Sequence, residues 1–159
     1  MQNNVIRALE HGWEGIPAEG YRPGAAPGVE RHTIVGRRKS DPSQSGPQLE
    51  LRYFELAPGA ATRLEKHEHE HFVIVKIGLG HAIVGENLAA VAPNDVVYVG
   101  SLEPHQFVNR GQGPFGFYCI VTAARDVSQE LSGQDLRRLE RSPAGIVMRR
   151  DVPRAVLRL

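Results

Sequence analysis

The sequence predicts an all-β sandwich or barrel that forms a single domain. Short runs rich in valine, isoleucine and aromatic residues recur at roughly 8–12-residue spacing, and glycine, proline or asparagine ends each run. The length of 159 residues suits one domain with one core. We divide the chain into an N-terminal arm over residues 1–30, a β-barrel over residues 31–124, and a C-terminal helix and tail over residues 125–159.

The arm contains one short helix candidate, residues 4–10, followed by a path rich in glycine and proline. This composition predicts an irregular segment that lies over the domain. A disordered terminus is the alternative, because chain ends often fray.

The predicted strands follow in chain order, and turn residues separate them. They cover residues 32–36, 49–56, 65–77, 79–84, 88–91, 96–99, 105–109 and 115–122. Residues 37–48 hold serine, aspartate, glycine and two prolines, which predicts an exposed loop. The residues around Gly85 predict a hairpin turn.

The pattern changes after residue 123. Ser132 and Asp135 have the spacing of a capping-box variant, which predicts that a helix begins there, with Leu136 and Leu139 on one side. Pro143 and a following glycine end it. Residues 145–159 alternate arginine with apolar residues and form either a strand-like tail or a solvated one.

The charge balance excludes some partners. Nineteen basic and eighteen acidic residues leave a formal charge of +1, so nothing in the composition favours nucleic acid or an anionic membrane. No run approaches the roughly 18 apolar residues of a membrane helix, and the first ten residues lack the apolar core of a signal peptide. Cys119 is the single cysteine, which favours a reducing compartment. We expect a soluble cytoplasmic protein.

The segment from Glu65 to His71 carries the chemistry. Because side chains alternate along a strand, Glu65, His67, His69 and His71 are predicted to share one face. Burying four such groups is unfavourable by several kcal/mol unless something binds them, on the order given for buried polar groups. His105 is their candidate partner from a distant segment.

The spacing of this segment resembles the first motif of the cupin superfamily. Gly59 is followed after five residues by Glu65-x-His67, after three more by His71, and after six more by Gly78. The second motif is matched in spacing by Asn94, Gly100, Leu102, His105 and Asn109, of which only the histidine and the last asparagine match in type. The resemblance covers residues 31–124 and implies a jelly-roll barrel.

The resemblance also implies a metal centre. Its ligands would be Glu65, His67, His71 and His105, so that the usual three histidines and one carboxylate are kept with the carboxylate moved. The arrangement is similar to small manganese cupins and to the manganese-binding half of ureidoglycine aminohydrolase. Mixed nitrogen and oxygen ligands with open positions favour Mn(II) or Fe(II), and Ni(II), Co(II) or Zn(II) also fit. His69 is either an alternative ligand or a hydrogen-bonding group at the pocket rim.

Other residues are predicted to line the barrel. Arg52 and Phe54 alternate onto the inner face of their strand, as do Phe117 and Cys119. Arg52 is a candidate to bind a substrate carboxylate through its planar fork, with a structural ion pair as the alternative. Phe54, Phe117 and Cys119 would line the substrate pocket or simply fill the core. Arg52 and His69 are therefore our candidate catalytic residues.

Three functions remain open. An open metal site in an apolar barrel favours a dioxygenase acting on a small chelating substrate. A non-redox lyase, isomerase or aminohydrolase would use the ion as a Lewis acid. A non-catalytic small-molecule-binding protein is the third. The outward face of the histidine strand, with Phe72, Ile74 and the stem of Lys76, must be covered by the arm or a second subunit, so we also expect a homodimer.

Overall fold

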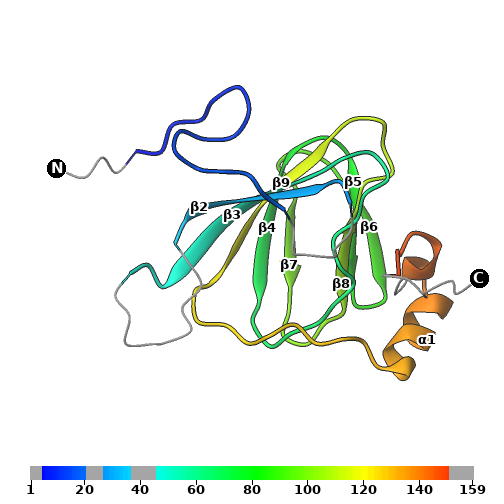
Figure 1. Ribbon diagram of the computed structural model, residues 1–159. Helices are drawn as coiled ribbons and strands as arrows, with labels where there is room; N and C mark the ends of the chain where they lie inside the picture. Colours follow the sequence, from blue (N-terminus) through cyan, green and yellow to red (C-terminus); the bar gives the residue numbers. More distant parts are fainter. Residues whose placement is uncertain (1–4, 21–26, 37–45, 151–159) are drawn as a thin grey trace, which may run out of the picture.

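The structure is a computed structural model that describes residues 5–20, 27–36 and 46–150. Within these residues the strands form two antiparallel sheets that face each other (Figure 1). The larger sheet has the order β1-β2-β3-β9-β4-β7, with bounds Glu19–Gly20, Val29–Val35, Leu49–Leu56, Phe115–Thr122, His71–Ile77 and Val96–Val99. The smaller sheet has the order β6-β5-β8, with bounds Asn87–Val91, Gly80–Val84 and His105–Val108. The prediction of an all-β single domain is confirmed.

The core lies between the two sheets and follows the strand alternation. On β9, Phe115, Phe117 and Cys119 are buried, and Phe117 stands opposite Phe54 of β3. Val73 of β4 stands opposite Cys119 and is fully buried. The inner face of the larger sheet is therefore apolar around Phe117.

The N-terminal arm does not contain the predicted helix. Residues 5–10 are irregular, and Asn4 lies outside the described residues. A helix of about seven residues is marginal in water because nucleation is costly. The chain turns back instead through isolated bridges that join Trp13 to Ala8 and to Ile16.

Trp13 attaches the arm to the outer face of the larger sheet. Its ring lies 5.0 Å from the Tyr53 ring and 5.5 Å from the His32 ring, centroid to centroid. The Lys76 ammonium lies 4.8 Å from the Trp13 ring centroid, within the range of a cation–π contact. The arm therefore covers the part of this face around Lys76, whereas Phe72 and Ile74 stay exposed.

The C-terminal prediction is confirmed at the helix start. Helix α1, Gly133–Arg141, begins with a capping box in which Ser132 and Asp135 bind each other's backbone amides. A 3-10 helix, Pro143–Ile146, follows. Residues 147–150 form no strand, and residues 37–45 and 151–159, which held most of the predicted loop and tail, lie outside the described residues.

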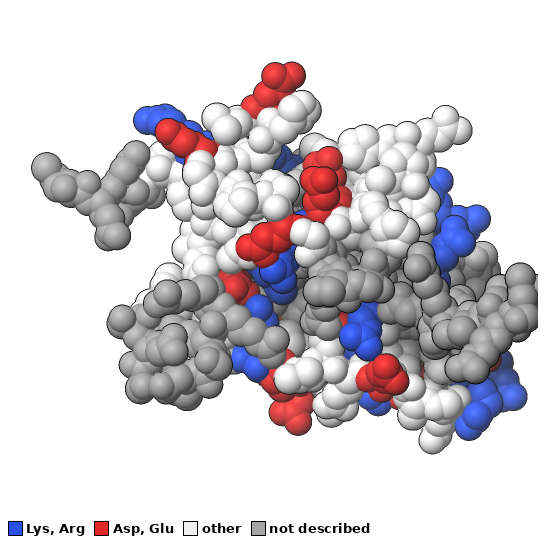
Figure 2. Space-filling model, viewed as in Figure 1, with Lys and Arg blue, Asp and Glu red and all other residues white. Residues whose placement is uncertain are grey.

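The surface matches the balanced composition. Figure 2 shows acidic and basic side chains interspersed over the face seen in Figure 1. No helix within the described ranges has the length and apolar character needed to cross a membrane.

Candidate metal centre and adjoining pocket

The predicted histidine strand is regular only from His71 onward, so the prediction of a strand over residues 65–77 is wrong for its first half. The preceding backbone bonds to two separate segments instead of one neighbouring strand. Glu65 exchanges backbone hydrogen bonds with His105, at 2.9 and 3.3 Å, and Lys66 exchanges them with Gln129, at 2.8 and 3.3 Å. The first exchange brings Glu65 beside His105, which begins β8.

The predicted ligands nevertheless gather in one place. One ligand atom from each of Glu65, His67 and His105 lies within 4.8 Å of the others, and all three residues are buried. The His71 ring centroid lies 4.5 Å from that of His67 and 5.2 Å from that of His105. One ligand atom from each of His67, His69 and His71 also lies within 4.8 Å of the others, so two overlapping groups from two distant parts of the chain share His67.

Backbone carbonyls set the orientation of two of these rings. The Nδ1 atom of His67 lies 2.7 Å from the His69 carbonyl oxygen, and Nδ1 of His105 lies 3.0 Å from the Glu103 carbonyl oxygen. A carbonyl only accepts, so each Nδ1 carries the proton and each Nε2 keeps its lone pair. Among the described residues, Nε2 of His67 and Nε2 of His71 are buried without a hydrogen-bond partner. Such atoms suit a metal ion.

Burial keeps these histidines neutral. It lowers the pKa of His67 and of His105 below the ordinary value. It also lowers the pKa of His71, and the nearby His105 and Arg52 lower it further. Neutral imidazole is the form that binds a divalent ion. The donor set therefore fits Mn(II), Fe(II) or a related ion at neutral pH.

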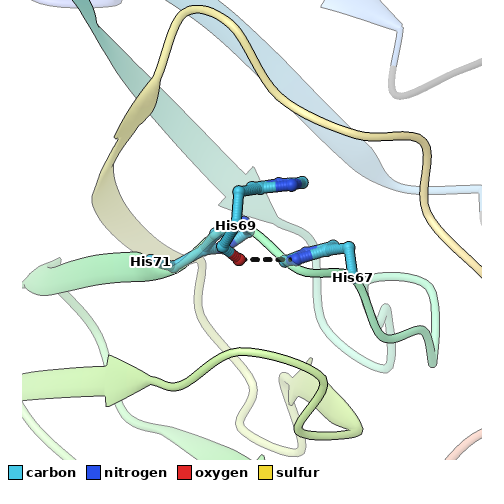
Figure 3. Close-up of side chains that lie close together, drawn as sticks. All are labelled: His67, His69 and His71. Atoms are coloured by element: carbon cyan, nitrogen blue, oxygen red, sulfur yellow. Dashed lines mark hydrogen bonds between the residues drawn. The ribbon is translucent and has the colours of Figure 1, made fainter.

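His69 lies beside the cluster. Its ring stacks on the His67 ring (Figure 3). The two ring centroids are 3.6 Å apart, and the Nδ1 atom of His69 lies 2.5 Å from Asp126 Oδ1. Asp126 also accepts the backbone amides of Glu68, at 2.8 Å, and His69, at 3.1 Å. Burial lowers the pKa of His69 to about 4, against the opposing effect of Asp126. Burial alone would raise the pKa of the Asp126 carboxyl. The hydrogen bonds from Glu68 and His69 outweigh burial and hold that pKa below its usual range.

Two cavities that share lining residues adjoin the cluster. An inner void of about 50 Å³ is lined by Phe54, Phe117, Cys119 and ligands of the cluster. A mouth of about 570 Å³ opens beside His67, His69 and Arg125. Arg52 lines both. All the predicted pocket residues are therefore placed beside the candidate metal centre.

Cys119 connects Arg52 with the cluster. The Arg52 Nη2 atom donates to Cys119 Sγ at 3.2 Å, and Sγ lies 3.6 Å from His71 Nδ1. Arg52 Nε also lies 4.0 Å from a Glu50 carboxylate oxygen, so the predicted ion pair with a barrel glutamate is present at long range. Burial raises the pKa of the Cys119 thiol, and the Arg52 guanidinium opposes that shift.

Sequence reasoning missed Arg31 and Asp126. Arg31 lies on β2 and lines both cavities. Strand alternation could have identified it, because His32 and Ile34 lie on the outer face and their neighbours Arg31 and Thr33 must then point inward. The predicted strand began one residue too late to include Arg31. No local pattern marks Asp126, because its role depends on where the chain runs after β9.

Comparisons with known proteins agree with this architecture. The model of the family described as "Cupin domain" matches residues 52–121. A protein of Rhodospirillum rubrum named 1-methylthio-D-xylulose 5-phosphate methylsulfurylase is 37% identical over 138 residues, which cover 85% of this chain and 84% of that protein.

Two solved structures are similar over most of their length. The crystal structure of Rru_A2000 from Rhodospirillum rubrum, described as a cupin-2 domain, is 34% identical with a TM-score of 0.74, covering 88% of this chain and 91% of that one. A cupin 2 conserved barrel domain protein from Rhodopseudomonas palustris is 31% identical with a TM-score of 0.70, covering 87% and 93%. The fold is thus the jelly roll that the resemblance implied.

Proposed function

The chain belongs to the cupin family, and we propose that it is a metal-dependent enzyme that removes the methylthio group from a phosphorylated 1-methylthio ketose. The observation that carries this proposal is the position of Cys119, the single cysteine of the chain. It lines the inner void beside the metal ligands and contacts both Arg52 and His71. The Rhodospirillum rubrum relative, named for such a substrate, supports the substrate class.

Cys119 is the group that would accept the methylthio group. Its sulfur attacks the sulfur of the substrate, an S–S bond forms, and the bond between that sulfur and C1 breaks. The electron pair passes to C1 as an enolate of the neighbouring ketone, and C1 then takes up a proton. The enzyme is left as a methyl disulfide, and a second thiol must reduce it. A reducing cytoplasm, as expected for this chain, supplies thiols.

The surroundings of Cys119 favour the reactive thiolate. A neutral His71 that binds an ion through Nε2 carries its proton on Nδ1, which faces Cys119 Sγ. Arg52 Nη2 faces the same sulfur. Two N–H donors that converge on one buried sulfur stabilise its anion against the cost of burial. Arg52 is therefore proposed to activate Cys119 rather than to bind a carboxylate.

Glu65, His67, His71 and His105 would hold the divalent ion, with Mn(II) or Fe(II) preferred over Ni(II), Co(II) and Zn(II). When bound, such an ion supplies Lewis acidity that polarises the ketone of the substrate. His69, which Asp126 fixes at the rim of the mouth, is proposed to accept a hydrogen bond from a substrate hydroxyl through its unprotonated Nε2, and the proton that C1 takes up comes from water. Elemental analysis of untagged protein identifies the ion.

The test is the reaction itself. Metal-loaded protein is incubated without oxygen with 1-methylthio-D-xylulose 5-phosphate and dithiothreitol, and the dethiomethylated ketose phosphate is sought by NMR. We expect turnover by the wild type and its loss in Cys119→Ser. A single incubation without added thiol should add the mass of one methylthio group to Cys119. Failure of the wild type with every metal, or full activity of Cys119→Ser, rejects the proposal.

A dioxygenase, as predicted from the sequence, is the second candidate. Phe54, Phe107 and Phe117 form an apolar wall beside the cluster, which favours oxygen and an aromatic or enolic chelator. Oxygen uptake with catecholate or enolate substrates supports this reading, and turnover without oxygen supports the methylthio transfer. Protein that stays metal-free in replete medium points to the non-catalytic alternative.

We also propose a homodimer. Phe72 and Tyr98 stand opposite each other on β4 and β7, as do Ile74 and Val96, and together they form an exposed apolar patch. A second copy is the simplest cover for it. Light scattering should give a dimer for the wild type and a monomer for Phe72→Glu, and a monomeric wild type at high micromolar concentration removes the proposal.

A further inference from the structure

Arg31 occupies an inner position of the larger sheet at the edge of the pocket. In the antiparallel register, Glu19, Arg31, Phe54 and Phe117 stand opposite one another across β1, β2, β3 and β9. Residues directly opposite in such a sheet project from the same face. Because Phe54 and Phe117 line the inner void, Arg31 and Glu19 project toward the same interior.

Arg31 lies between the reaction site and solvent. It lines the inner void of about 50 Å³, together with Cys119 and His71, and it also lines the mouth of about 570 Å³. Thr33 lines the mouth as well, from the next inward position of β2. A molecule whose reacting end reaches Cys119 therefore extends past Arg31 toward the opening.

Of the described residues that line the mouth, the other two with guanidinium groups, Arg52 and Arg125, are engaged within the protein wall. Arg125 Nη2 lies 2.6 Å from a Glu50 carboxylate oxygen, and Arg52 Nε lies 4.0 Å from that oxygen. The Glu50 side chain is only 4% exposed. This buried group of Arg52, Glu50 and Arg125 keeps an excess positive charge on the wall.

Arg31 is held differently. Its guanidinium donates to the Glu19 carboxylate from both Nε and Nη2. Glu19 is 41% exposed and belongs to β1, a strand of two residues. The Arg31 side chain is 28% exposed, so solvent reaches both partners of this pair. Ion pairs that solvent reaches contribute little net free energy, and an anion that enters the mouth can therefore compete with Glu19.

We propose that Arg31 is the phosphate-binding residue of the substrate site and that the Glu19 carboxylate occupies this position until a phosphate monoester replaces it. The assignment rests on the ketose phosphate proposed above. The planar fork of an arginine matches a phosphate with two parallel hydrogen bonds. The positive wall formed by Arg52 and Arg125 adds attraction without direct contact.

Calorimetry on metal-loaded protein tests the proposal without turnover, with inorganic phosphate, D-xylulose 5-phosphate and D-xylulose as probes. Arg31→Gln should weaken both phosphate-bearing probes by roughly 10- to 100-fold, the range for a charged hydrogen-bonded pair. Its affinity for D-xylulose should not change. Glu19→Gln should tighten the phosphate-bearing probes several-fold, because the competing carboxylate is gone.

Two further variants serve as controls. Arg138→Gln removes an exposed arginine of α1 that pairs with Glu86, away from the mouth, and should bind all probes like the wild type. Arg31→Lys keeps the charge but not the fork, and should lie between the wild type and Arg31→Gln. Circular dichroism confirms that each variant is folded.

The outcomes separate this assignment from the proposed function. If Arg31→Gln binds D-xylulose 5-phosphate like the wild type, or if the wild type does not discriminate D-xylulose 5-phosphate from D-xylulose, the phosphate assignment is rejected even when methylthio transfer occurs. If phosphate binding depends on Arg31 and Glu19 as described while no methylthio transfer is found, the assignment stands and the reaction is rejected.

Discussion

Asp126 Oδ1 lies 2.5 Å from His69 Nδ1, and this contact joins the segment after β9 to the loop that carries the candidate ligands. The same carboxylate accepts two backbone amides of that loop. The position of His67 and His71 therefore depends on a residue that follows β9.

We predict that Asp126→Ala lowers the free energy of unfolding by about 1–3 kcal/mol, because it removes the charged acceptor of two backbone amides of the loop and of the His69 ring. Urea denaturation of the metal-free protein measures this. Glu130→Ala is the matched control, since this neighbouring carboxylate is 89% exposed and pairs with Arg63 at 3.5 Å. Equal stability of the two variants would mean that Asp126 does not hold the loop.

His105 is predicted to be required for metal binding. His105→Gln removes the ligand that β8 contributes, so metal content by mass spectrometry should fall sharply. An ion at a concentration of 100 times its dissociation constant raises the free energy of unfolding by about 2.7 kcal/mol. The variant should not show this increase when metal is added. His11→Gln, at an exposed position of the arm, should keep both metal and stabilisation. A fully loaded His105→Gln protein contradicts the ligand assignment.

Leu102, in the loop before His105, has a backbone conformation that is unfavourable for a non-glycine residue. Its φ is +60°, in the left-handed region that favours glycine. This conformation costs a non-glycine residue roughly 1–2 kcal/mol, whereas glycine adds about 0.5–1 kcal/mol of unfolded-state entropy. Leu102→Gly should therefore leave stability unchanged or raise it by up to about 1 kcal/mol in thermal unfolding.

The control for Leu102 is Leu79→Gly, which changes another exposed leucine without a positive φ. That variant should lose stability, because only the entropic effect remains. If Leu102→Gly loses as much as Leu79→Gly, the left-handed conformation is not a cost in solution.

The lowered pKa of Asp135 predicts that the free energy of unfolding decreases in acid. The hydrogen bond from Lys66, followed by that from Ser132, lowers its pKa from 3.8 to about 2. A lowered folded-state pKa means that the contribution is present above pH 3.8 and is lost as the pH falls toward 2. The wild type should therefore exceed Asp135→Asn in unfolding free energy at pH 6, and the two should converge near pH 2. A constant difference across this range contradicts the coupling.

The sequence predicted those parts of the fold that local patterns control. The bounds of β3 and β9 match residues 49–56 and 115–122, because each run is rich in apolar and aromatic residues and turn residues end each strand. The capping box of Ser132 and Asp135 was predicted for the same reason, because it depends only on residues that are close in sequence. The helix over residues 4–10 was wrong, since the position of that segment depends on Trp13 reaching a distant sheet.

In the candidate site too, local patterns predicted some features, and contacts between distant segments set the others. The four candidate ligands were predicted from their spacing, and that assignment stays a prediction; the strand argument behind their common face failed for Glu65 and His67. Their convergence comes from backbone pairing with His105 and from Asp126, and both contacts join segments that are far apart in sequence. Arg31 was missed because the predicted strand began at residue 32, whereas β2 begins at Val29. The inward position of Arg31 was therefore left outside the strand.

Trp13 is the single tryptophan of the chain, and it is buried against Tyr53 on the side of the larger sheet away from the pocket. The intrinsic fluorescence of the protein is therefore an optical report on whether the arm is docked. Release of the arm from the sheet can accordingly be followed as a change in tryptophan emission.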